Sequence, residues 1–249
     1  MLSSKVARNA VALLLILLLG LTGCERTINR SAERRIRDAL PDLIGPARSY
    51  NVHVSGAAER TVQGHLANVT VDGDDVDLPN SLLLDRLHLD LKDVEVDTGH
   101  RRIRSIGDVR FAATLGETSL DEFLAGESPE GEPIRNTRVH IEGNGSVTIA
   151  ADRVVLGAGV PFRLTGPLRI VGPQSVEIDP TRLTVVGIPI SGLPLRFLKQ
   201  RFESAIDLSS LPFPVRLTGV QTQPGKLILS GAADVTAMLE RAQTAPRRP

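Results

Sequence analysis

The chain has 249 residues and a formal net charge of zero, with 29 Lys and Arg against 29 Asp and Glu. A near-neutral chain has no broad positive field for nucleic acid, and with no Trp and one Tyr it lacks the aromatic platforms of single-strand binders. A single cysteine excludes an internal disulfide, so the fold must be stabilised by apolar packing.

The N-terminal residues have the layout of a bacterial lipoprotein signal. Two cations precede an apolar run over residues 11–19, and the small residues Thr22 and Gly23 lead to Cys24. This run is shorter than the roughly 20 residues of a membrane-spanning helix. We therefore predict a signal peptide over 1–23 and a lipid on Cys24. The alternatives, an uncleaved anchor or a chance cysteine after a secretory signal, also place the remainder outside the cytoplasm.

This signal predicts a lipid-anchored protein of the cell envelope. Residues 24–30 would form a tether, and residues 25–30 reach at most about 20 Å when extended, so the following domain is held near the bilayer. Glu25 follows the cysteine, which favours the outer membrane in a two-membrane bacterium. In a one-membrane bacterium the anchor would lie in the outer face of the plasma membrane.

The first predicted helix covers residues 31–40. Ala32, Ile36 and Leu40 share one face, and we expect Pro41 and the Gly45-Pro46 pair to end the helix. The spacing of apolar residues then changes to every second position, which is typical of strands with one buried face. The clearest pairs and runs are Val52/Val54, Val69/Val71, Leu87/Leu89/Leu91, Val94/Val96 and Val109/Phe111/Ala113/Leu115. Changes of parity near Leu66 and after Leu91 indicate bulges.

A short helix up to about Ala125 follows, with Ser119 and Glu122 as its capping box. The second half alternates again as strands, and a further helix is predicted over 193–206. We expect residues 31–235 to form a single domain and 236–249 a disordered tail. The predicted class is α+β, mostly β, with antiparallel sheet. Either two sheets pack as a sandwich, or one long bent sheet wraps around a helix and leaves a cavity.

Catalytic chemistry is not apparent in the sequence. The five histidines form no metal-binding spacing, and no nucleophile or phosphate-loop motif occurs. Asp72, Asp74, Asp75 and Asp77 are clustered, but a calcium loop of the EF-hand type would need ligands where Val76 and Leu83 stand. A solvated hairpin turn is the favoured interpretation of this cluster. We predict that the protein is not an enzyme and uses no metal or cofactor.

Several stretches, in order and spacing, resemble the LmeA-like family of phospholipid-binding cell-envelope proteins over residues 30–235. They are Val62 to Val71, Val94-Glu95-Val96, Val109 to Leu115 followed by Ser119-Leu120-Asp121-Glu122, Leu193-Pro194-Leu195, Leu211-Pro212-Phe213-Pro214-Val215 and Gly225-Lys226-Leu227. The resemblance implies a fold like tubular lipid-binding domains, with an antiparallel sheet bent around a helix. It also implies phospholipid binding without catalysis. The lipoprotein cysteine is not a feature that the family requires, and it favours a tethered carrier or sensor.

The resulting hypothesis is an apolar groove, between curved sheet and helix, that binds the acyl chains of a phospholipid. The residues predicted to contact lipid are Leu87, Leu89, Leu91, Phe111, Leu195, Leu198, Phe202 and Leu217. A structural or assembly lipoprotein with a filled core is the main alternative. An enzyme acting on lipid or glycan is a third, and it would need titratable groups that converge in a pocket.

Overall fold

The computed structural model describes residues 28–78, 82–97, 102–126, 134–155, 158–190, 206–208 and 215–233. The described chain is mostly strand, with a helix over residues 28–43 and the shorter helices α2 (Ala58–Val62) and α3 (Glu117–Gly126). All described strand pairs are antiparallel. The predicted class, α+β and mostly β with an N-terminal helix, is confirmed.

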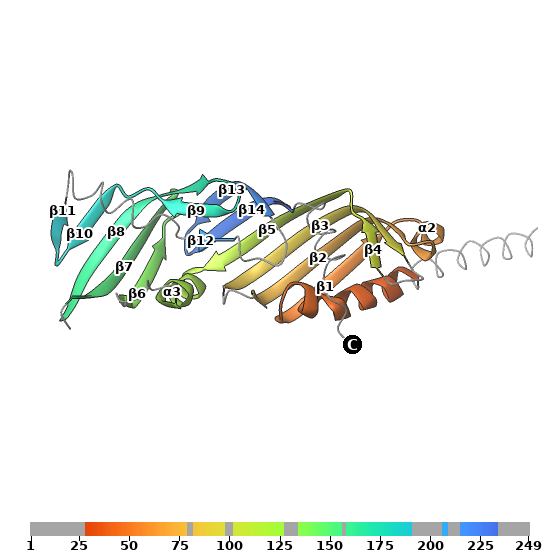
Figure 1. The fold of residues 1–249 in the computed structure, drawn as a ribbon, viewed down its shortest axis with the longest axis horizontal. Coiled ribbons are helices and arrows are strands. Elements are labelled where there is room, and N and C mark those ends of the chain that lie inside the picture. Colours follow the sequence, from red (N-terminus) through yellow and green to blue (C-terminus); the bar gives the residue numbers. More distant parts are fainter. Residues whose placement is uncertain are drawn as a thin grey trace, which may run out of the picture.

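The first sheet joins strands from both ends of the chain, in the order β1-β2-β3-β5-β14-β13, with β4 paired to β3 (Figure 1). Its strands are β1 (Ala47–Ser55), β2 (His65–Asp77), β3 (Leu83–Asp97), β4 (Arg102–Ser105), β5 (Asp108–Gly116), β13 (Val215–Gln223) and β14 (Lys226–Ala233). The chain leaves this sheet after β5, forms the second sheet, and returns as β13 and β14, where β14 pairs with β5.

The second sheet is built from the middle of the chain, in the order β11-β10-β8-β7-β6, with β9 paired to β8 and β12 to β9. Its strands are β6 (Ile134–Ile141), β7 (Ser146–Val155), β8 (Ala158–Val171), β9 (Ser175–Ile178), β10 (Arg182–Val185), β11 (Ile188–Ile190) and β12 (Ile206–Asp207). The molecule is elongated, and the two sheets lie one after the other along its length (Figure 1).

Hydrogen bonds join the two sheets where β13 and the β13–β14 turn meet the turns and strand ends of the second sheet. Gly225 N donates to Ile141 O at 3.0 Å, Gly145 N to Thr222 Oγ1 at 2.8 Å, and Leu217 N to Pro173 O at 2.7 Å. One hydrophobic cluster contains buried residues of both sheets. The described strands therefore form two connected sheets rather than one, and the single domain over 31–235 stays a prediction.

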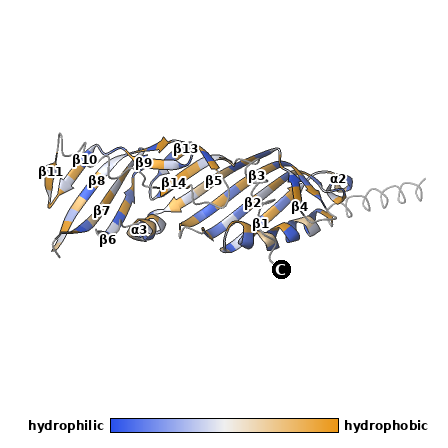
Figure 2. Cartoon of the chain, viewed as in Figure 1, coloured by the Kyte–Doolittle hydropathy of each residue, from blue (hydrophilic) through white to orange (hydrophobic). Residues whose placement is uncertain are grey.

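Apolar and polar residues alternate along the strands, as Figure 2 shows. In β2 the buried positions change from Leu66 to Val69, and in β3 from Leu91 to Val94. The predicted parity changes are confirmed, but the β2–β3 register does not shift there. Leu66 lies opposite Val94 and Val69 opposite Leu91, so both strands change face together. The two apolar residues of each facing pair therefore lie on the same side of the sheet.

The N-terminal helix packs Ala32, Ile36 and Leu40 against the core, as its sequence predicts. Its predicted end at residue 40 is wrong, because residues 41–43 remain helical. Proline in the last turn removes only one backbone donor, and the helix ends before the Gly45-Pro46 pair, the second predicted stop signal. Residues 28–30, which were predicted to be tether, are also helical.

The acidic cluster at 72–77 lies in strand β2, so the predicted hairpin turn is wrong. Neighbouring strands supply partners for its carboxylates: Asp75 pairs with Arg48 at 3.0 Å and Asp72 with His88 at 2.7 Å. These cross-strand partners allow acidic residues to continue the ladder. In the described part of the chain, no three His, Cys, Asp or Glu side chains are grouped to hold a metal ion.

Some predicted segments lie outside the described residues. They are the signal peptide (1–23), Cys24, the tail (236–249) and residues 193–205 of the predicted second helix. The last residue of that helix, Ile206, is described and belongs to strand β12, where it pairs with Val176. The prediction of a helix as far as residue 206 is therefore wrong at its C-terminal end.

Candidate functional site

Helix α3 lies at the junction of the two sheets and forms one wall of an apolar pocket (Figure 1). Strand β5 ends at Gly116 and the helix begins at Glu117, with no loop between them. Leu120 and Leu124 are four residues apart, so they share one face of the helix, and both line the pocket.

The start of α3 is held by Asp85 of strand β3. Asp85 Oδ1 accepts hydrogen bonds from Gly116 N at 3.2 Å and from Ser119 Oγ at 3.0 Å. The predicted capping box of Ser119 and Glu122 is therefore wrong. The helix begins two residues earlier, and a carboxylate distant in sequence takes the place of a local cap.

Two carboxylates of α3 attach the helix to the edge of the second sheet. Glu117 Oε1 accepts the backbone N–H of Ile141 at 2.8 Å, and Asp121 Oδ1 accepts that of Val139. Strand β6 is the last strand of its sheet, so these N–H groups have no neighbouring strand on that side. His140 Nδ1 lies 3.0 Å from the Glu117 carboxylate, and Arg138 forms an ion pair with Asp121 at 3.4 Å.

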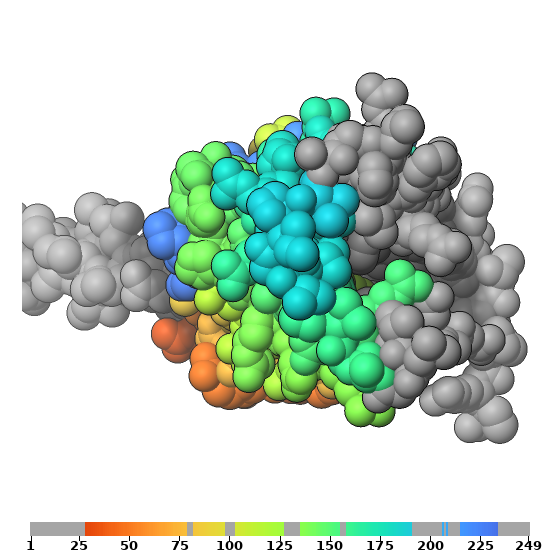
Figure 3. Space-filling model, turned by 90° about the vertical axis from the view of Figure 1, so that its left-hand side faces the viewer, coloured from red at the N-terminus to blue at the C-terminus, as the bar shows by residue number. Residues whose placement is uncertain are grey.

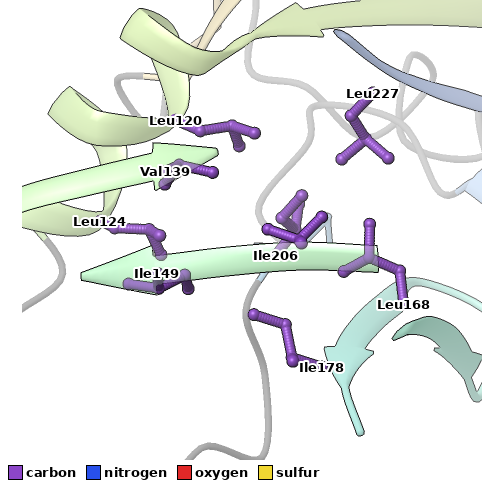
Figure 4. A pocket seen from close by; sticks show the side chains of 9 residues that line it. Leu120, Leu124, Val139, Ile149, Leu168, Ile178, Ile206 and Leu227 are labelled. Carbon is purple, nitrogen blue, oxygen red and sulfur yellow. The ribbon is translucent and has the colours of Figure 1, made fainter. Parts of the chain in front are cut away.

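The pocket is lined only by aliphatic side chains (Figure 4). They come from α3, from strands β6 to β9, and from β12 and β14: Leu120, Leu124, Val139, Val147, Ile149, Leu168, Ile178, Ile206 and Leu227. Its volume is about 20 Å³, enough for about one water molecule. A lining without hydrogen-bonding side chains favours hydrocarbon over any polar ligand.

An apolar strip continues from the pocket along the same face of the second sheet. Pocket residue Ile149 lies opposite Leu164, which lies opposite Leu183, which lies opposite Ile190. A parallel row runs from Phe162 to Val185 and Ile188. Exposure rises along the strip, from 0% at Leu164 to 64% at Ile188. We call the six residues Phe162, Leu164, Leu183, Val185, Ile188 and Ile190 the apolar strip.

The structure places the predicted lipid-contacting residues in two groups. Five of them belong to the main hydrophobic cluster and none of these lines the pocket: Leu87, Leu89, Leu91, Phe111 and Leu217. The other three, Leu195, Leu198 and Phe202, lie outside the described residues. The lipid contacts of all eight stay predictions. From the sequence, the pocket residues could be assigned only to strands and helices. The alternation of apolar residues marks a buried face but does not show what covers it.

The pocket contains no titratable side chain. Away from the pocket, burial raises the pKa of Tyr50 in β1, whose hydroxyl donates to Gly45 O at 2.8 Å. No helix in the described part of the chain has the length and apolar character needed to span a membrane.

Comparison with protein families matches residues 20–232 to the family described as LmeA-like phospholipid-binding. The matched range includes both sheets, α3 and every residue of the pocket. No curated protein and no solved structure matches the chain.

Proposed function

Because the chain belongs to the LmeA-like phospholipid-binding family, we propose that it binds a phospholipid through its acyl chains. The chains would occupy the pocket beside α3 and extend along the apolar strip. The observation that carries this proposal is the continuity of the two surfaces: Ile149 and Leu168 line the pocket and also pack in the cluster of Leu164 and Leu183.

The driving force would be transfer of hydrocarbon out of water. Each buried CH₂ contributes about 0.8 kcal/mol, so a single fatty chain supplies ample free energy for binding. The pocket offers no hydrogen-bonding side chain, so its shape would select the acyl chains. Recognition of the head group would have to come from residues outside the pocket.

Binding requires the pocket to widen. Ligand pockets usually enclose about 300–1,000 Å³, whereas this pocket has about 20 Å³. The wall formed by β12 is the simplest one to move, since this strand has two residues and β9 is its only partner strand in the described part of the chain. By contrast, α3 is held by Asp85 and by two bonds to β6. Displacing Ile206 would open the pocket toward Val176 and the apolar strip.

The setting that we propose is the cell envelope, with the chain anchored through a lipid on Cys24 and acting as a carrier or sensor. The signal-like residues up to Cys24 support this proposal. A tethered carrier would exchange lipid with the membrane surfaces that its domain reaches.

A structural lipoprotein with a filled core is the second candidate. The small volume of the pocket favours it, because a space of about 20 Å³ can also be an ordinary packing defect. In that case the hydrophobic cluster at the sheet junction would serve stability alone.

Native mass spectrometry separates the two candidates. We would purify the chain from Glu25 to Pro249 without detergent, since the described core begins at Ala32 and is retained. A stoichiometric phospholipid, lost in Leu124→Asp but kept in Leu43→Asp, would support binding at the pocket. Leu43 is the matched control, because it is a helical leucine that is 59% exposed. A clean protein mass, with no uptake from phospholipid vesicles, would exclude the lipid carrier and favour the structural protein.

A further inference from the structure

The β10–β11 hairpin forms the end of the second sheet that lies farthest from the first sheet (Figures 1 and 3). Val185 pairs with Ile188, so Val186 and Gly187 make a two-residue turn. Val186 is 62% exposed and Ile188 is 64% exposed. Val186 N donates to Pro161 O at 2.9 Å, and this places an exposed proline beside the turn.

Neither backbone preference nor packing explains valine at this turn. Val186 has φ 51° and Gly187 has φ 77°, as a type I′ turn requires, and asparagine is the favoured residue at the first of these positions. The other described non-glycine residues with positive φ are Asp75, Asp93 and Asn136, which tolerate this conformation. A β-branched residue there is strained, and at 62% exposure it gains little from burial within the chain.

Positive charges lie in the strands that lead to this apolar tip. Strands β8, β10 and β11 contain three arginines and no acidic residue. Arg169 pairs with Asp179, but Arg163 and Arg182 are exposed and form no ion pair with any described residue. Arg163 lies opposite Thr184, two residues before the turn, and Arg182 is at the start of β10. The β10–β11 hairpin and the neighbouring strand β8 therefore combine exposed apolar side chains with two arginines that have no ion-pair partner among the described residues.

We propose that this end of the molecule docks on a bilayer surface that contains anionic phospholipid. Val186 and Ile188 would enter the interfacial region, and Arg163 and Arg182 would contact lipid phosphates. Apolar insertion together with basic residues is the usual combination for reversible attachment to a membrane surface. The proposal goes beyond lipid binding at the pocket and does not depend on it. Because Ile188 also belongs to the apolar strip, docking would bring one end of the strip against the bilayer.

Vesicle co-sedimentation of the chain from Glu25 to Pro249 tests this docking. We expect binding to phosphatidylcholine vesicles that contain phosphatidylglycerol, weaker binding to phosphatidylcholine alone, and release by salt. Val186→Asn should weaken binding about tenfold while the melting temperature stays equal or rises, because asparagine suits the turn. Val62→Asn, at an exposed valine (59%) of α2, is the matched control and should bind as the unchanged chain does.

The electrostatic part is tested by the double variant Arg163→Gln, Arg182→Gln, with Arg48→Gln, Arg110→Gln on the first sheet as its control. The first pair should abolish the preference for phosphatidylglycerol, and the second pair should leave it unchanged. Absence of vesicle binding, or full binding by Val186→Asn, would overturn docking at this hairpin. Native mass spectrometry on the same variants keeps the two proposals distinct, because a protein that retains bound phospholipid but does not dock contradicts only the docking surface.

Discussion

The carboxylate of Glu117 accepts a hydrogen bond from the backbone N–H of Ile141 at 2.8 Å and so satisfies a donor on the edge strand of the second sheet. The first sheet has the same arrangement. There Glu33 of the N-terminal helix accepts the backbone N–H of Val54 on the edge strand β1, at 3.1 Å. In both sheets a helical carboxylate occupies an edge that would otherwise present a free donor to another chain.

Asp121 gives the second bond of this kind, to Val139 N, and its removal tests the contribution to stability. Asp121→Ala leaves a buried donor unsatisfied, so we expect the free energy of unfolding to fall by about 1–3 kcal/mol. Urea denaturation measures this. Asp121→Asn keeps an acceptor and should cost less, and Glu122→Ala, at an exposed position of the same helix, should be nearly neutral. If Asp121→Ala and Glu122→Ala lowered the unfolding free energy equally, the hydrogen bond between Asp121 and the edge strand β6 would not be the cause of the loss.

Widening the pocket separates a lipid site from a packing defect. Ile206→Ala removes most of a side chain that is 3% exposed and lines the pocket, so we expect a loss of about 2–5 kcal/mol in unfolding free energy. If β12 is the movable wall, uptake of a fluorescent phospholipid from vesicles should become faster despite this loss. If the pocket is only a packing defect of a structural core, Ile206→Ala should lower the stability without making phospholipid uptake faster. Leu66→Ala, in the core away from the pocket, is the control for destabilisation without widening.

Tyr50 makes stability depend on pH at alkaline values. Burial raises its pKa above the ordinary value of 10.0, so the folded chain holds the phenolic proton more tightly than the unfolded chain does. The stabilisation is complete below pH 10 and is lost as pH rises through the folded pKa. Thermal melts across this range should show Tyr50→Phe to be less pH-sensitive than the unchanged chain. The variant also loses the bond to Gly45 O, at a cost of about 0.5–1.5 kcal/mol.

Gly231 allows β14 to pack against the ring of Phe111. A Cβ at Gly231 would lie 2.7 Å from Phe111 Cε1 and would also meet the backbone of Arg216, so Gly231→Ala should destabilise by about 1–3 kcal/mol or more. Gly126→Ala is the control, since nothing lies within 4 Å of its Cβ position. Similar melting temperatures for the two variants would show that the strand shifts to make room.

Much of the fold was predictable from local pattern. Ala32, Ile36 and Leu40 identify the buried face of the first helix, and the change from Leu91 to Val94 marks the change of face in β3. These features follow from the periods of helix and strand, which neighbouring residues determine. The family was also recognisable, because it depends on the order and spacing of short motifs along the chain.

The tertiary structure alone decided where the pocket lies. Leu87 and Ile149 have the same alternating pattern, but one is covered by packed core and the other lines the pocket. In the same way Arg48 and His88 are brought beside the acidic residues of β2, and Asp85 holds the start of α3. Local sequence determines which face of an element is apolar. What covers that face depends on partners distant in the chain, and these are brought together only when the sheets assemble.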